Sequence, residues 1–293
     1  MRRRRNWRSG CDTTMTIEAE VGARGRGDAV AYHEQLPAVG ARPWLHRAWS
    51  VQTLAAVDDF IVVPDGCVDV LFSPQTGLQL VGTMSVAQTF ALPAAAAVTG
   101  VRLRPGAAAL WLRCDLSELT DRQVDLAAVL GRSLRRLEAR MLEASTAAER
   151  RALLSVALSG WLSAAWDGGR PQDRGLLRAL AAMDHLGAER VDELAAQCGL
   201  SPRQFQRRCL ALAGLPPKRL LRVRRVLRAL WQHARHGTGW ASAAAEAGFA
   251  DQAHFSRDFT RLIGCSPGRY AQRGGDVRFV QARPANAPVE CDP

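Results

Sequence analysis

The hydrophobic positions of the chain follow two different periods, which meet near residue 117. Before that point, short runs rich in β-branched and aromatic residues alternate with Gly and Pro, at 60–63, 67–72, 78–81 and 99–103. Such runs, bounded by turn residues, are typical of strands. Asp65 and Gly66 lie between the first two runs and predict a turn there. We therefore expect residues 30–115 to form a compact β-rich unit.

Beyond residue 117 the apolar residues recur at helical spacing. Those that share the first helical face are three or four residues apart, namely Leu126, Leu130, Leu134, Leu137 and Met141. This spacing predicts an amphipathic helix over 126–141, and a second helix is expected over 147–161. The polar segment 167–174 contains two glycines and a proline, residues that interrupt helices. It is expected to be a linker.

The last third of the chain is expected to be entirely helical. Ser201 is followed by Pro202 and by Gln204, the arrangement of a capping box with proline at the first helical position. Asp251 is placed to cap a later helix in the same way. A longer amphipathic helix is expected over 218–235, and at 1.5 Å per residue it would be about 27 Å long.

Two of these helices have an apolar stripe on one face and DNA-reading residue types on the other. Phe205 and Cys209 form the stripe of the first, and Phe255, Phe259 and Leu262 that of the second. Arginine pairs well with guanine and glutamine with adenine in the major groove. Helix-turn-helix units at 191–209 and 240–261, joined by a stiff helix, can enter successive major grooves about 34 Å apart.

The distribution of charge along the chain also favours DNA as the partner. The formal net charge is +11, and residues 175–273 hold 16 basic against 7 acidic residues, whereas residues 28–166 hold 12 against 13. A local excess of basic residues favours a polyanion as the partner of the C-terminal third.

The helical third resembles the AraC/XylS family of transcriptional regulators. The motifs that carry the resemblance in the first unit are Leu194-Ala195, Gly199-Leu200-Ser201, Gln206-Arg207, Gly214 and Pro217. Those in the second unit are Gly248-Phe249, Asp251-Gln252, His254-Phe255, Arg257, Phe259, Gly264, Ser266-Pro267 and Tyr270. The resemblance covers about a hundred residues, and it implies a double helix-turn-helix domain that binds a double-stranded DNA operator.

The resemblance also implies which residues contact DNA. The base-reading positions are Arg203, Gln206 and Arg207 in the first unit and Gln252, Ala253 and Arg257 in the second. Ala253 is restricted to methyl contact. The candidate phosphate contacts are Ser201, Arg208, Arg222, Arg225, Arg228, His254 and Arg261. A solvated helix face explains the arginines of 222–228 equally well, and metal ligation by His254 is disfavoured because no second ligand lies three or four residues away.

The N-terminal part resembles a domain found on one branch of AraC-type regulators. The matching segments are 32–37, 64–72, 81–82, 100–107 and 119–121. The resemblance implies an α+β protein overall, in which a cupin-like small barrel with trailing helices precedes the helical domain. It further implies sensing of an unidentified small-molecule effector or homodimerisation through this domain, and it allows contact with RNA polymerase.

Candidate chemistry in the N-terminal part is weak. Cys67 lies between Asp65 and Asp69, whose charges would raise a thiol pKa, so a plain buried or turn cysteine is expected. His33 and His46 lack the spacing of a cupin metal site. Arg102 and Arg104 share one strand face, and we expect that face to point into water rather than into a cavity for an acidic ligand. We expect no enzymatic activity, no cofactor and no metal.

The remaining expectations concern boundaries and compartment. The domains are expected at 28–166 and 175–273, with tails at 1–27 and 274–293, and either Met1 or Met15 could be the natural start. Seven scattered cysteines and the lack of a long apolar run favour a cytoplasmic protein that does not enter a membrane. Two alternatives stay open: a DNA alkylation-damage sensor that accepts a methyl group on a cysteine, and an architectural protein that binds DNA without sequence preference.

Overall fold

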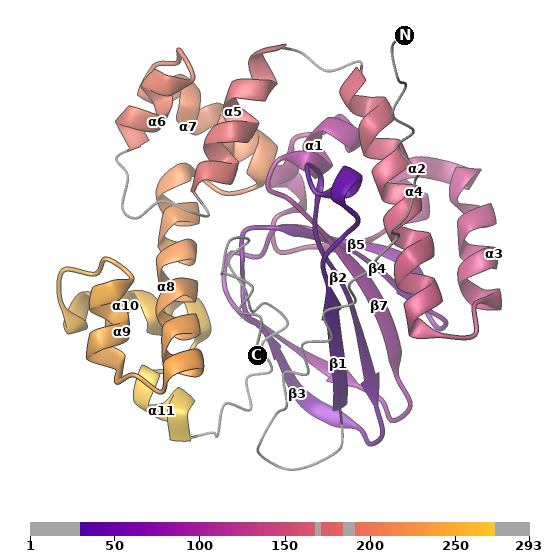
Figure 1. Cartoon of the computed structure of the whole chain (residues 1–293), viewed down its shortest axis with the longest axis horizontal. Coiled ribbons are helices and arrows are strands. Elements are labelled where there is room, and N and C mark those ends of the chain that lie inside the picture. The colour runs from indigo at the N-terminus through magenta and orange to yellow at the C-terminus, as the bar shows by residue number, and fades with distance from the viewer. Residues whose placement is uncertain (1–29, 168–170, 184–190, 273–293) are drawn as a thin grey trace, which may run out of the picture.

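The computed structural model describes residues 30–167, 171–183 and 191–272. Within these residues a β-rich half precedes an all-helical half, and α8 runs along the boundary between them (Figure 1). This is the mixed fold expected from the two hydrophobic periods. The expected tails at 1–27 and 274–293 lie outside the described residues.

The described part of the N-terminal half contains two antiparallel sheets. The strands are β1 (Val30–Gln35), β2 (Leu45–Thr53), β3 (Val57–Val62), β4 (Val68–Ser73), β5 (Gly77–Val81), β6 (Gln88–Leu92), β7 (Ala97–Leu103) and β8 (Gln123–Asp125). Six of them form one sheet in the order β1-β2-β7-β4-β5-β8, and β3 pairs with β6. The predicted runs fall in or beside β3, β4, β5 and β7, which confirms the β-rich unit.

The large sheet buries both of its faces because its strands alternate between two apolar clusters. Along β4, Val70 and Phe72 belong to the main core with the helices, whereas Leu71 packs with Trp49 and Phe60 against the small sheet. Successive strand residues point to opposite faces, so both clusters are built from the same strands. Gly100 leaves space for the Trp49 indole, because a Cβ at residue 100 would lie 2.4 Å from that ring.

Four α-helices follow in the N-terminal half: α1 (Ala107–Leu112), α2 (Leu126–Leu130), α3 (Arg135–Glu143) and α4 (Ala147–Asp167). The expectation of one helix over 126–141 is wrong. Gly131 has a φ of 71°, a left-handed conformation that ends α2, and a 3-10 turn precedes α3. The stripe still packs as predicted, because Leu126, Leu134 and Met141 are all buried in the main core.

The helical half consists of α5 (Pro171–Ala182), α6 (Val191–Gln197), α7 (Pro202–Ala213), α8 (Pro217–His236), α9 (Trp240–Glu246), α10 (Gln252–Ile263) and α11 (Pro267–Gln272). Residues 171–174, expected to be linker, belong to α5, whose Leu176 and Leu180 pack against the first helix-turn-helix unit. The long helix α8 serves both units: Leu220 lies in the core of the first, and Val223 and Val226 lie in that of the second.

Candidate DNA-binding surface

The helix α7 presents the first set of predicted base-reading residues. Its start is a complete capping box: Gln204 N–H donates to Ser201 Oγ, and Ser201 N–H donates to Gln204 Oε1 over 3.0 Å. Phe205 and Cys209 are fully buried, so the opposite face points outward. That face carries the exposed Arg203, Gln206 and Arg207. Within the described residues these three side chains make no hydrogen bond or ion pair, which leaves them available for a partner.

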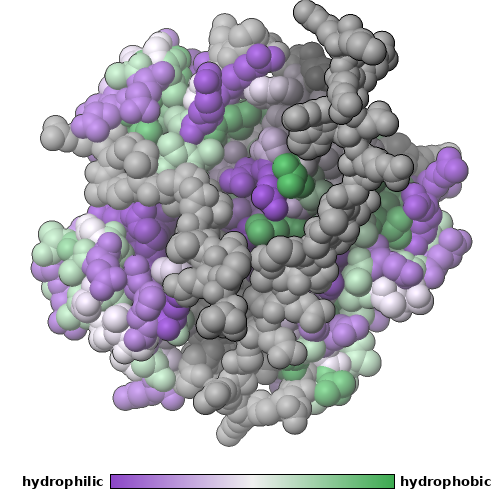
Figure 2. Space-filling model, viewed as in Figure 1, coloured by the Kyte–Doolittle hydropathy of each residue, from purple (hydrophilic) through white to green (hydrophobic). Residues whose placement is uncertain are grey.

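The helix α10 is built in the same way. Asp251 caps it by accepting a 2.6 Å hydrogen bond from His254 N–H. Phe255 and Phe259 are buried, while the predicted base-reading residues Gln252, Ala253 and Arg257 are exposed. Hydrophilic side chains are prominent on the visible face of the helical half (Figure 2). Both helices therefore present polar residues behind a capped turn.

The core beneath α10 is aromatic. Trp240 packs 5.3 Å from Phe259 and 5.9 Å from Tyr270 between ring centroids. Its ring also stacks on His233 at 3.8 Å. Ala243 is fully buried. The second unit thus has a packed core in spite of the small residue.

Several residues predicted to contact phosphate are engaged inside the protein. Arg208 pairs with Asp173 over 2.8 Å, and Ser201 is occupied by its cap. Arg225 lies over the ring of Phe249 at 5.2 Å. Arg261, in contrast, has a side chain that is 66% exposed and only a 4.0 Å contact to a carboxylate. Among the predicted phosphate contacts described here, Arg261 is the one with the most accessible charge.

Asp258 is a buried acid that sequence reasoning did not single out. Its carboxylate lies 3.2 Å from Arg222 Nε on α8 and 3.4 Å from His254 Nε2 within α10. Two predicted phosphate contacts, Arg222 and His254, are thus joined to one carboxylate that is 4% exposed. The Arg222–Asp258 contact links α10 to α8. Its only sequence signal was an acid at an apolar position of the stripe.

Positive charge is concentrated along α8. Burial lowers the pKa of Arg228, and the nearby charges of Arg225 and Arg224 lower it further. Mutual repulsion of this kind between buried cations is relieved by a nearby anion. Arg224, one turn before Arg228 on α8, is buried against the N-terminal half.

In the N-terminal half, one expected side-chain environment is confirmed and another is wrong. Cys67 is buried, as expected for a plain cysteine. The expectation that Arg102 faces water is wrong: it is 1% exposed and pairs with Asp65 over 2.8 Å and with Asp69 over 3.4 Å. These carboxylates raise its pKa. Arg104 donates from Nε to the carbonyl of Arg42 over 2.6 Å.

The residues that the structure describes contain no group of three or more His, Cys, Asp or Glu side chains arranged to hold a metal ion. None of their helices is both long enough and apolar enough to cross a membrane.

Two family models match the chain, one in each half. Residues 194–273 match a family model described as a helix-turn-helix domain, and residues 33–125 match a domain of unknown function (DUF6597). No curated protein matches the chain. Among solved structures, a lysine-to-alanine variant of apo ToxT from Vibrio cholerae is 13% identical with a TM-score of 0.37, covering 85% of this chain and 99% of that one. Wild-type ToxT bound to an unsaturated fatty acid is 13% identical with a TM-score of 0.36, covering 84% and 96%.

The match to the helix-turn-helix model spans both reading helices and the whole of α8. The N-terminal match spans all eight described strands except the start of β1. The chain therefore carries an AraC-type helix-turn-helix domain behind a β-rich domain of unknown function, which is the make-up of a DNA-binding transcriptional regulator.

Proposed function

We propose that the protein recognises a specific operator by placing α7 and α10 in two successive major grooves. The observation that carries this proposal is that both helices present exposed Arg and Gln side chains behind a capped turn and both pack on α8. With 20 residues, α8 is about 30 Å long, close to one turn of B-DNA. One chain can therefore bring both readers to the same side of the duplex.

The first helix contributes more base discrimination in this proposal. Arg203, Gln206 and Arg207 can each hydrogen-bond to base edges, whereas Ala253 on the second helix can only contact a thymine methyl group. Arg261 is the favoured phosphate contact, because Arg208 and Arg222 are already paired with carboxylates. Arg257 and Gln252 complete the second reader.

Selection of bound duplexes from a random pool, followed by gel-shift titration at fixed salt, tests the proposal. Arg207→Ala should weaken binding to the selected operator by about 1 to 3 kcal/mol and relax one base position. Arg136→Ala, which removes an exposed helical arginine from the N-terminal half, should leave affinity unchanged. Equal affinity for selected and random duplexes would instead favour the architectural alternative, since a regulator prefers its site by about 10³ or more.

We further propose that a small molecule controls DNA binding from the N-terminal half. Support comes from a cavity of about 310 Å³ between the two sheets, within the range of ligand pockets. Trp49, Phe60 and Leu71 are among its lining residues. Control requires that the ligand bind two states of the protein with different affinities. The same gel-shift titration, repeated with small-molecule libraries, should yield compounds that change operator affinity.

A further inference from the structure

The loop between β3 and β4, residues 63–67, packs directly against the connector helix α8. Val63 is 1% exposed and lies in the same apolar cluster as Val223 and Val226. Gly66 has a φ of 76°, and a Cβ there would lie 2.2 Å from a methyl carbon of Leu220. The loop therefore fits against one face of α8 with no room for a larger residue.

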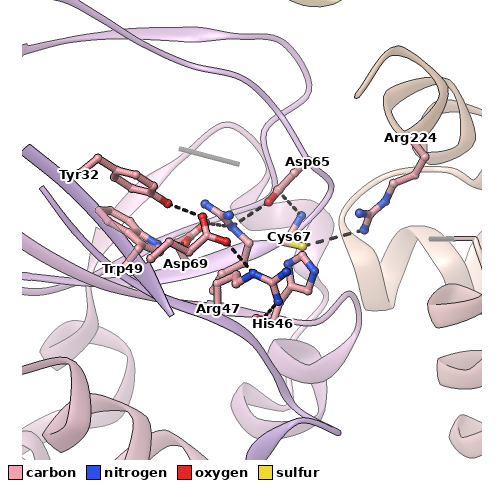
Figure 3. A network of polar contacts seen from close by, with 10 residues as sticks. Tyr32, His46, Arg47, Trp49, Asp65, Cys67, Asp69 and Arg224 are labelled. Atoms are coloured by element: carbon pink, nitrogen blue, oxygen red, sulfur yellow. Dashed lines mark hydrogen bonds and ion pairs between the residues drawn. The ribbon is translucent and has the colours of Figure 1, made fainter. Parts of the chain in front are cut away.

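The tip of the loop also contacts α8 through polar groups. Arg224 Nη2 reaches Cys67 Sγ over 3.9 Å, and Figure 3 shows this arginine entering from α8 toward the loop. Because α8 forms part of the cores of both helix-turn-helix units, a shift of this loop reaches both reading helices.

On its other side the loop contacts a buried polar network within the β-rich half. Asp65 accepts a hydrogen bond from Cys67 N–H over 2.8 Å and pairs with Arg102 over 2.8 Å. Arg102 also contacts Asp69 over 3.4 Å, and Asp69 accepts a 2.8 Å hydrogen bond from Trp49 Nε1. Figure 3 shows Trp49 at one side of this network and Cys67 toward α8. An unbroken set of contacts thus joins the indole to the connector.

The indole is a wall of the cavity between the sheets. Trp49 lines it together with Phe60 and Val62 of β3, the strand that leads directly into the loop. The loop is therefore connected to the cavity twice, through the chain of β3 and through the Arg102 network. Two carboxylates share one buried guanidinium, so displacing Asp69 changes the contact that Arg102 makes with Asp65. Such interactions are strong in a low-dielectric interior.

The lining of the cavity defines the class of ligand. No charged residue is among the described residues that line it, and the polar ones are Ser73, Gln75, Thr76, Gln79 and Gln123. A buried charge without a partner is costly, which disfavours an ionic ligand. Amide and hydroxyl groups suit a ligand with an apolar body and one or two neutral hydrogen-bonding groups.

We propose that the cavity takes an uncharged, largely apolar molecule, and that loop 63–67 transmits its occupancy to α8. The inference rests on the proposed control of DNA binding by an effector. A ligand seated against Trp49 shifts the indole and β3, the Arg102 contacts redistribute, and Asp65 moves with the loop. Packed interfaces of this kind change between discrete arrangements, so the shift of the loop is passed through α8 to α7 and α10.

The test uses the full chain and N-phenyl-1-naphthylamine, an uncharged aromatic fluorophore. It should bind with fluorescence transfer from tryptophan, roughly tenfold more tightly than the anionic 8-anilinonaphthalene-1-sulfonate. Val51→Trp, which fills the cavity, should abolish binding. Hydrogen exchange should change by about threefold or more in residues 63–67 and 217–226 when the neutral probe binds.

The route is tested by comparing buried arginines. Arg102→Met and Arg224→Met should retain probe binding but lose the exchange response in α8. If Arg102→Met fails to fold, Arg224→Met still tests the route, because it leaves the two sheets unchanged. Arg47→Met is the matched control, because Arg47 is a buried arginine of the same half whose ion-pair partner is Glu34, at 2.6 Å, and not an acid of the loop. It should keep the response.

The possible outcomes test the ligand class and the route through loop 63–67 separately. Probe binding without any exchange response in wild-type α8 would overturn the route while leaving a ligand site between the two sheets. Absence of binding, or tighter binding of the anionic probe, would overturn the ligand class. Operator binding by the free protein, measured separately, decides the DNA-binding proposal and is independent of both results.

Discussion

At the residue scale, the buried polar groups of the N-terminal half have the least expected environments. The alternation of β7 puts Arg102 on the face opposite Val101 and Leu103, and there it is enclosed by Asp65 and Asp69 from a different segment. Burial raises the pKa of Asp69, and Arg102 opposes that rise. A single buried arginine thus compensates two carboxylates.

His46 is buried beside this network and gives stability a defined pH dependence. Neither ring nitrogen has a hydrogen-bond partner among the described residues, and burial, followed by the charges of Arg47, Arg102, Arg224 and Arg104, lowers its pKa well below 6.5. Below pH 6.5 the His46 imidazole is therefore protonated in the unfolded chain while it stays neutral in the folded protein. Stability should fall as pH drops below about 6.5, by at most about 1.4 kcal/mol per pH unit.

Urea unfolding of wild type and His46→Phe between pH 7.5 and about 5 measures this contribution. The variant should lose less stability over that interval, and the difference isolates His46 from the carboxylates. His33→Phe, at an exposed position, is the matched control. Parallel pH profiles for wild type and His46→Phe would contradict the prediction.

At the scale of elements, caps and glycines decide where helices begin and end. The α7 start follows from four consecutive residues at 201–204, because a capping box satisfies backbone groups locally. The break between α2 and α3 follows from Gly131 in a left-handed conformation. The apolar stripe continued across that break, so periodicity alone predicted one helix.

Removing the α7 cap should lower the stability of the protein. Ser201→Ala leaves an orphan amide at the start of the reading helix and should cost about 0.5 to 2 kcal/mol of unfolding free energy. Ser163→Ala, at an exposed site in the interior of α4, should cost far less. Denaturant unfolding compares the two, and equal losses would show that the cap contributes nothing.

At the scale of the whole molecule, the β-rich half caps the ends of both reading helices. Thr83 Oγ1 donates to the carbonyl of Ala213 over 2.8 Å, and Thr120 Oγ1 donates to that of Gly214 over 2.7 Å, both at the end of α7. Ala87 N–H donates to the carbonyl of Leu262 on α10 over 2.8 Å. The last carbonyls of a helix have no partner within it, and here the other domain supplies one.

The two threonine contacts predict a measurable cost. Thr83→Val and Thr120→Val each keep the side-chain shape but leave a carbonyl unpaired at the domain contact, which should cost roughly 1 to 3 kcal/mol. Thr89→Val, exposed on β6, is the control. Urea unfolding followed by tryptophan fluorescence measures the loss, and wild-type stability in the double variant would rule out a role for these bonds.

The sequence by itself determined the local features of this protein. Strand-rich and helix-rich halves, the capped starts of α7 and α10, their buried faces and the exposure of Arg203, Gln206, Arg207, Gln252 and Arg257 all follow from residues within a few positions of each other. Periodicity and capping depend only on such short spacings. The short strands at the edges, and the strand order, were not resolved in this way.

Only the tertiary structure decided which charged residues face a partner and which are used internally. Arg208 and Arg222 are helical arginines like Arg207, yet each meets a carboxylate from another helix. Arg102 is buried because two acids from the β3–β4 region surround it, and Arg224 is buried because a loop of the other half packs on α8. Pairings of this kind join segments far apart in the chain, so their energy depends on how the segments pack and has no signal in local spacing.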